Sequence, residues 1–287
     1  MKKLLILSGK GGTGKTTTAA AFIHFSKAKA TADCDVDAPN LHMVTKMKTQ
    51  PEYKEFIGAE KAVIDADKCI QCGQCMDQCR FNAIEKGSDA YKVLDQACEG
   101  CAVCEYICPS GAVSMVDDVA GTQRLYRDDE SVFSTAELKM GRGNTGKLVS
   151  DVKQAMFKNA PETDLAIVDG SPGIGCPVIA SVTGMDMVLV VAEPSLSGVS
   201  DLKRLVKTAR GFQTKLAVCV NKWDSSPEKT KLIEDFCQKE EIPYVGRIPY
   251  DKMASKAINS CKSLAEIDCP ARDALHEIYQ KVMDILF

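Results

Sequence analysis

Eight of the fourteen cysteines lie in a short stretch between Cys69 and Cys108 and form two runs with identical spacing. In each run three cysteines recur at every third position, and a fourth follows four residues after the third. The runs are 29 residues apart at every matched cysteine. Closely spaced thiolates are ligands for zinc and for iron–sulfur clusters. The candidate ligands are Cys69, Cys72, Cys75 and Cys79, and then Cys98, Cys101, Cys104 and Cys108.

Each run resembles the cysteine motif of bacterial ferredoxins, and Pro109 follows the second run as in that motif. In two-cluster ferredoxins the last cysteine of each run serves the other cluster. The resemblance therefore implies two [4Fe-4S] clusters, one on Cys69, Cys72, Cys75 and Cys108, the other on Cys98, Cys101, Cys104 and Cys79. Arg80 replaces the proline after the first run, which changes the local charge but not the ligand set. Zinc is the alternative metal, although zinc ribbons pair two CxxC knuckles per ion.

A glycine-rich loop near the amino terminus has the composition of a phosphate site. Gly9–Thr16 satisfies GxxxxGK[ST] between a predicted strand, Leu4–Leu7, and a predicted helix, Lys15–Lys27. Backbone N–H groups of such a loop converge on phosphate oxygens at a helix amino terminus. Lys15 is expected to reach the β- and γ-phosphates, and the Thr16 hydroxyl to bind Mg²⁺. The expected nucleotide contacts are Gly11, Gly12, Thr13, Gly14, Lys15, Thr16 and Thr17.

The additional lysine, Lys10, makes this loop resemble the deviant Walker A motif of the MinD/ParA/Mrp/nitrogenase iron-protein superfamily. That resemblance implies an ATPase that forms a nucleotide-sandwich homodimer, in which Lys10 reaches the partner's nucleotide. Asp33–Asn40 resembles switch I of the superfamily, and Asp169–Gly173 resembles switch II.

Two carboxylates of these switches are assigned roles in hydrolysis. A carboxylate at a strand end can orient the attacking water, and another can hold Mg²⁺ through its water shell. We assign the first role to Asp35 and the second to Asp169. The repeated Asp-x-Asp-x-Asp leaves Asp33 and Asp37 open as alternatives.

The base of the nucleotide is expected to lie near two later segments. Asn221 opens the sequence Asn-Lys-Trp-Asp, which spells the guanine-binding NKxD motif of small GTPases. In the resembling superfamily an asparagine at this place contacts adenine, and the segment around Pro249 resembles its second base-side loop. The resemblance therefore implies ATP, with GTP as the alternative.

Apolar runs without polar alternation predict strands that are buried on both faces. The fold class predicted is α/β, a P-loop NTPase with a doubly wound, mostly parallel sheet and an inserted 2[4Fe-4S] ferredoxin-like domain. The predicted domains are residues 1–48 with 126–287 for the ATPase and 49–125 for the insert, with the module at about 60–117. The strands are Leu4–Leu7, Ala166–Val168, Val188–Val191 and Leu216–Val220. The helices are Lys15–Lys27, Gly146–Lys158, Ser200–Gly211, Pro227–Glu240 and Ala271–Phe287.

Composition excludes several classes of protein. The formal net charge of -3 disfavours a nucleic-acid partner, and the amphipathic terminal helix lacks the basic face of a membrane-surface helix. No apolar stretch approaches the ~18 residues of a membrane span, so we expect a cytoplasmic protein without a membrane partner. A reducing compartment makes disulfides the wrong expectation for so many cysteines.

The combined motifs resemble MinD-superfamily ATPases that contain an inserted ferredoxin domain. The function expected is ATP-driven dimer switching coupled to electron transfer, with a redox or cofactor-assembly protein as partner. The alternative is an iron–sulfur or metal-cofactor carrier ATPase, and a MinD-like positioning role is a weaker third. Of the remaining cysteines, Cys176 could have a redox role, although a packed thiol is favoured. The others are expected to be packing residues: Cys34, Cys219, Cys237, Cys261 and Cys269.

Overall fold

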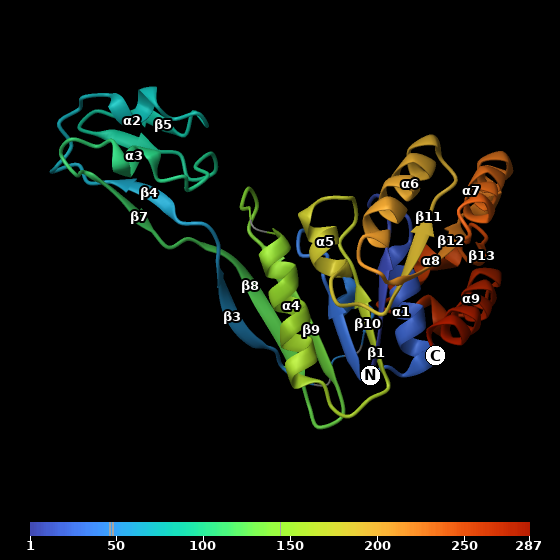
Figure 1. The fold of residues 1–287 in the computed structure, drawn as a ribbon. Helices are drawn as coiled ribbons and strands as arrows, with labels where there is room; N and C mark the ends of the chain where they lie inside the picture. Colours follow the sequence, from blue (N-terminus) through green and yellow to red (C-terminus); the bar gives the residue numbers. More distant parts are fainter. Residues whose placement is uncertain (46, 48, 144) are drawn as a thin grey trace. The chain divides into compact units, whose positions relative to one another are not determined.

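The computed structural model describes residues 1–45, 47, 49–143 and 145–287, and the chain divides into two compact units (Figure 1). The larger unit comprises Met1–Tyr53, Gln123–Ala136 and Thr145–Phe287. The smaller unit comprises Lys54–Thr122 and Glu137–Asn144. The smaller unit is therefore inserted in the larger one twice along the chain.

This division differs from the predicted boundaries at one segment. The sequence analysis assigned residues 137–144 to the ATPase domain, whereas they group with the smaller unit. The backbone N–H of Lys139 donates to the carbonyl of Ala120 over 2.8 Å, and Arg142 forms an ion pair with Asp118 at 2.8 Å. These contacts join residues that are close in space but not in sequence, so no local pattern indicated them.

Among the described residues, nine strands form one sheet in the order β13-β12-β11-β1-β10-β2-β9-β8-β3. The strands from β13 to β9 are joined by parallel pairs. β2, β10 and β11 are buried along their whole length, as expected of strands covered on both faces. The bounds are β1 (Lys2–Leu7), β2 (Ala30–Asp33), β3 (Glu52–Ile57), β8 (Val119–Arg127), β9 (Val132–Leu138), β10 (Leu165–Asp169), β11 (Met187–Ala192), β12 (Lys215–Asn221) and β13 (Tyr244–Ile248).

Helices cover both faces of this sheet in the larger unit (Figure 1). α1 and α9 pack on each other, and right-handed crossovers put α4, α5, α6 and α7 on the opposite face. The predicted strands and helices are all present, with ends shifted by a few residues. The helices are α1 (Lys15–Ser26), α4 (Thr145–Asn159), α5 (Cys176–Val182), α6 (Leu196–Arg210), α7 (Pro227–Lys239), α8 (Lys252–Asn259) and α9 (Pro270–Leu286), with 3-10 turns η1 (Leu41–Met43), η2 (Trp223–Ser225) and η3 (Leu264–Glu266).

The smaller unit is a duplication at the level of its elements. Its two short helices, α2 and α3, start 29 residues apart, the same offset as the cysteine runs. β4 pairs with β7 and β5 pairs with β6, both antiparallel, so that each half contributes one strand to each pair. The elements are β4 (Lys61–Ile64), α2 (Gln74–Asp77), β5 (Ile84–Lys86), β6 (Tyr91–Val93), α3 (Val103–Tyr106) and β7 (Val113–Val116).

Within the described part of the chain, no helix combines the length and the apolar composition needed to cross a membrane.

Candidate nucleotide and thiolate sites

The loop Gly9–Thr16 joins β1 to α1 and has the backbone geometry of a phosphate cradle. Gly12 and Gly14 have φ angles of 78° and 95°, which residues with side chains rarely adopt. A Cβ atom at Gly14 would also overlap the side-chain amide of Asn221. Gly14 is the N-cap residue of α1, so the free N–H groups of the first turn begin at this loop.

Lys15 lies at the centre of the site and is buried, with 5% of its surface exposed. Its Nζ lies 2.7 Å from Oδ1 of Asp169 and 3.6 Å from Oδ2 of Asp35. Asp169 ends β10 and is in register with Asp33 on the neighbouring strand β2. The parallel strands thus bring three carboxylates to one ammonium group.

Burial and electrostatic interactions compete in this cluster. Burial acts to lower the pKa of Lys15, but Asp169, Asp33 and Asp35 outweigh it and the pKa lies above its ordinary value. Burial, followed by repulsion from Asp169, raises the pKa of Asp33 to about 7. Burial also raises the pKa of Asp35 against the opposing effect of Lys15. The site therefore holds more negative charge than its own lysine compensates, which favours a cation.

The structure distinguishes the three aspartates that the sequence left open. The carboxylate of Asp33 is fully buried and accepts three backbone N–H groups over 2.9–3.0 Å. The donors belong to Asp35, Asn40 and Leu41. Asp33 therefore closes the loop, while Asp35 presents its carboxylate to Lys15 and Asp37 is exposed. A repeat of three identical side chains carries no signal for which one turns inward.

The residues present fit a magnesium ion bound through water. Oδ2 of Asp169 is buried and, among the described residues, has no hydrogen-bond partner. Oγ1 of Thr16 lies 3.4 Å from Nζ of Lys15, so the expected hydroxyl ligand is beside the carboxylate cluster. A hydroxyl, a carboxylate oxygen and excess negative charge are what Mg²⁺ requires.

Two contacts join the segments predicted to be switches. The backbone N–H of Cys34 donates to the carbonyl of Asp169 over 2.7 Å, and the hydroxyl of Ser171 donates to the carbonyl of Cys34. Cys34 is fully buried between the strand ends, and burial raises the pKa of its thiol well above the ordinary value. A displacement of one segment is therefore transmitted to the other.

Lys10 is held inside its own chain by a residue that the sequence analysis missed. Its Nζ lies 2.7 Å from Oε2 of Glu193, and 3.3 and 3.4 Å from the hydroxyls of Ser195 and Ser197. Lys222 lies 3.6 Å from the same carboxylate. Burial acts to raise the pKa of Glu193, but the two lysines outweigh it and the pKa lies below the ordinary value. The available signal was an acidic residue directly after a predicted parallel strand.

A cavity of about 730 Å³ extends from the phosphate loop to the segment after β13. Its lining includes Gly12, Gly14, Thr17, Asn221, Pro249 and Tyr250, which brings together the predicted loop and base-side residues. Nδ2 of Asn221 donates to the carbonyl of Thr13 over 2.7 Å and ties β12 to the loop. Asp224, the last residue of the NKxD segment, is not part of the lining, and its Oδ1 accepts the backbone N–H of Tyr250 over 2.8 Å.

In the smaller unit the eight clustered cysteines are free thiols. One cavity is lined by three cysteines of the first run and the last of the second: Cys69, Cys72, Cys75 and Cys108. The other cysteines contact a second apolar cluster, in which Cys98, Cys104 and Cys79 pack together.

Backbone donors approach the last cysteine of each run in the same way. The N–H of Ala83 donates to Sγ of Cys79 over 3.4 Å, and the N–H of Ala112, 29 residues later, to Sγ of Cys108 over 3.3 Å. Burial acts to raise the pKa of Cys108, but hydrogen bonds from Ser110 and from backbone N–H groups hold it below its ordinary value. Such donors stabilise thiolates and tune a bound cluster.

The thiols are not arranged around a single ion. Among the described residues, no three His, Cys, Asp or Glu side chains converge as ligands of one metal ion. A zinc site requires ligands about 2.0–2.3 Å from a common point. Four thiols around one cavity instead fit a polyatomic group whose iron atoms each take one thiolate.

Most of the remaining cysteines are packing residues, as expected. Cys219, Cys237 and Cys269 are buried, but Cys261 is exposed at a positive φ of 53°, which corrects the prediction for that residue. Cys176 is exposed at the start of α5.

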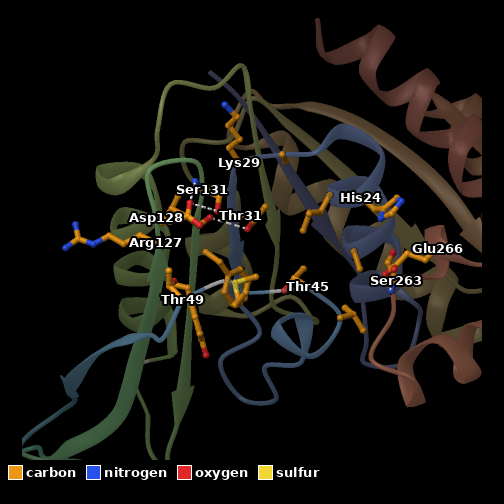
Figure 2. A pocket seen from close by; sticks show the side chains of 18 residues that line it. His24, Lys29, Thr31, Thr45, Thr49, Arg127, Asp128, Ser131, Ser263 and Glu266 are labelled. Carbon is orange, nitrogen blue, oxygen red and sulfur yellow. Dashed lines mark hydrogen bonds between the residues drawn. The ribbon is translucent and has the colours of Figure 1, made fainter.

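A further cavity of about 870 Å³ lies in the larger unit and is lined from α1, β2 and the region around β9 (Figure 2). Lys29, Thr31 and Ser131 lie along it, and Asp128 accepts the backbone N–H and the hydroxyl of Ser131. None of the predicted site residues lines this cavity, so it is separate from the phosphate loop.

The sheet topology and the phosphate loop define a P-loop nucleotide-binding protein. Residues 4–264 match the family model described as the CobQ/CobB/MinD/ParA nucleotide binding domain, and the chain belongs to that family.

Individual relatives agree with this assignment. The protein MJ0578 of Methanocaldococcus jannaschii is 32% identical over 288 residues, covering 99% of this chain and 97% of that protein. A protein named iron-sulfur cluster carrier protein, from Pyrococcus abyssi, is 26% identical over 303 residues, covering 99% of this chain and 86% of the relative. The crystal structure of the cell division ATPase MinD from Pyrococcus furiosus matches with a TM-score of 0.58 at 14% identity, covering 99% of both chains. At that identity the match concerns the fold.

Proposed function

We propose that this protein binds and hydrolyses Mg-ATP as a nucleotide-sandwich homodimer and couples that cycle to electron transfer through two [4Fe-4S] clusters. The observation that carries the proposal is the duplicated thiol module, with matching N–H to Sγ bonds at Cys79 and Cys108, in a chain that also holds the phosphate loop. A bound cluster supplies reversible one-electron transfer.

Nucleotide binding exchanges the partners of Lys15. The triphosphate replaces Asp169 as the counter-charge of the ammonium, and this frees the Asp169 carboxylate for the water shell of Mg²⁺. Asp35 then orients the attacking water, because its carboxylate is the one that faces Lys15 from the loop after β2. Asp33 keeps this loop in place through its three backbone bonds.

The base-side geometry supports ATP over GTP. Recognition of guanine by an NKxD segment requires a carboxylate at the base, whereas Asp224 lies outside the lining of the cavity and accepts a hydrogen bond from the backbone of Tyr250. Asn221 and Pro249 remain at the cavity as base contacts.

Dimer formation requires Lys10 to leave its own chain's Glu193. The ion pair is partly exposed, with Lys10 38% and Glu193 22% exposed, so its contribution to stability is small. A triphosphate on the partner subunit carries more charge than one carboxylate and competes effectively for this lysine.

The test replaces Lys15 by Ala. The variant is expected to keep the brown absorbance of the clusters while losing the ATP-dependent reduction of an electron acceptor, because the thiol module does not involve Lys15. Lys239→Ala, on the exposed end of α7, is the matched control and is expected to behave as the unmodified protein. Equal acceptor reduction with and without Mg-ATP in the unmodified protein would contradict the proposal.

The alternative function is an iron–sulfur carrier, and the relative with that name supports it. Its prediction differs: clusters leave the protein when an apoprotein is added, and nucleotide controls their departure. Retention of iron and sulfide in the presence of an excess of apoprotein separates the electron-transfer function from the carrier function.

A further inference from the structure

One buried charge distinguishes the two halves of the smaller unit. Lys61, at the start of β4, has only 9% of its surface exposed, and its Nζ donates to the carbonyl of Cys98. The loop after Cys98 lies directly on the same segment, because Gly100, at a φ of 69°, approaches the carbonyl of Glu60 too closely for a side chain. Lys61 is thus packed against the second cysteine run.

The duplication identifies the equivalent position in the other half. Residue 71 corresponds to Gly100 by the 29-residue offset, and Nε2 of Gln71 donates over 3.0 Å to the carbonyl of Asp89, the equivalent of Glu60. Both cysteine runs therefore contact the segment before a strand in the same way. The equivalent of Lys61 is Ala90, which carries no charge.

We propose that Lys61 makes the two cluster sites electrically unequal, so that a single electron rests on the cluster held by Cys98, Cys101, Cys104 and Cys79. This inference rests on the proposed function. A one-electron donor reduces the chain, and the electron moves from the site of Cys69, Cys72, Cys75 and Cys108, which becomes oxidised, to the Lys61 site, which becomes reduced.

The direction follows from electrostatics. Reduction adds a negative charge to a cluster, and a positive charge nearby favours the reduced form. The effect is large only where water does not screen it, and Lys61 is buried whereas the flanking Glu60 and Glu99 are exposed. The partner of its ammonium is a neutral carbonyl, so this bond leaves the positive charge in place.

The test is a redox titration of the anaerobically reconstituted protein, followed by electron paramagnetic resonance. The unmodified protein is expected to show two one-electron steps at different potentials. Lys61→Met is expected to lower the higher potential by at least a tenfold change in the one-electron equilibrium, about 59 mV, and to leave the other step in place. Lys61→Arg, which keeps the charge, is expected to retain the separation.

Two further variants control for total charge and for folding. Lys92→Met removes an exposed lysine from the same module and is expected to leave both potentials unchanged. Ala90→Lys places a charge at the equivalent position and is expected to raise the lower potential. Unchanged potentials in Lys61→Met, or equal shifts of both steps, would overturn the inference.

Counting iron and acid-labile sulfide distinguishes failure of this inference from failure of the proposed function. About eight of each per chain, with potentials that do not respond to Lys61→Met, refutes only the role of Lys61. A reconstituted chain that holds zinc, or no iron, refutes the proposed function itself.

Discussion

Asp33 shows how one side chain can serve structure beside reacting groups. Its carboxylate organises the loop that carries Asp35, yet it is buried beside Asp169. Burial and this like charge raise its pKa to about 7, so its ionised form destabilises the folded protein in the absence of compensating cations.

The pH dependence of stability tests this account. Because the folded pKa of Asp33 exceeds the unfolded value, the folded state holds the extra proton between about pH 4 and 7, and the free energy of unfolding decreases as the pH rises through that range. Each unit of pKa difference corresponds to about 1.4 kcal/mol. Urea unfolding of nucleotide-free protein across this range is expected to show the decrease, and Asp33→Asn to reduce it.

Asp37→Asn is the matched control, since Asp37 is exposed in the same loop. It is expected to leave the pH dependence unchanged. The same pH dependence in Asp33→Asn and the unmodified protein would refute the assignment.

At the scale of elements, Lys153 couples two helices. It is a buried residue of α4, and its Nζ donates to three carbonyls at the end of α5, those of Ala180, Ser181 and Thr183, over 2.6–2.8 Å. α5 follows switch II along the chain, and α4 follows directly after the segment that belongs to the smaller unit. This connection makes α4 the candidate element for transmitting nucleotide state to the thiol module.

Lys153→Met is expected to destabilise the protein by about 2–4 kcal/mol, because three buried carbonyls lose a charged donor. It is also expected to speed hydrogen exchange at the end of α5. The control Lys158→Met alters an exposed residue of the same helix. Equal exchange rates in the two variants would show that Lys153 does not anchor α5.

At the scale of the whole molecule, Lys10 links the nucleotide cycle to assembly. Its ion pair with Glu193 occupies the side chain within one subunit, so that a sandwich dimer requires a change of partner. The exchange needs no rearrangement of the core, because both residues lie in loops at the carboxyl edge of the sheet.

Lys10→Ala is therefore expected to remain monomeric when Mg-ATP is added, whereas the unmodified protein shifts to a dimer in light-scattering chromatography. Lys203→Ala, on the exposed side of α6, is expected to dimerise normally. A normal dimer in Lys10→Ala would contradict the sandwich arrangement.

Local patterns were sufficient for much of this protein. Continuous apolar runs indicated the buried parallel strands, and the spacing of the phosphate loop and of the thiols identified the candidate sites, because each signal lies within a few neighbouring residues. The pairing of Lys10 with Glu193, the inward turn of Asp33 and the burial of Lys61 at Cys98 were decided by the tertiary structure. These contacts join residues from different strands and loops, and only the order of strands in the sheet and the packing of the duplicated halves bring them together.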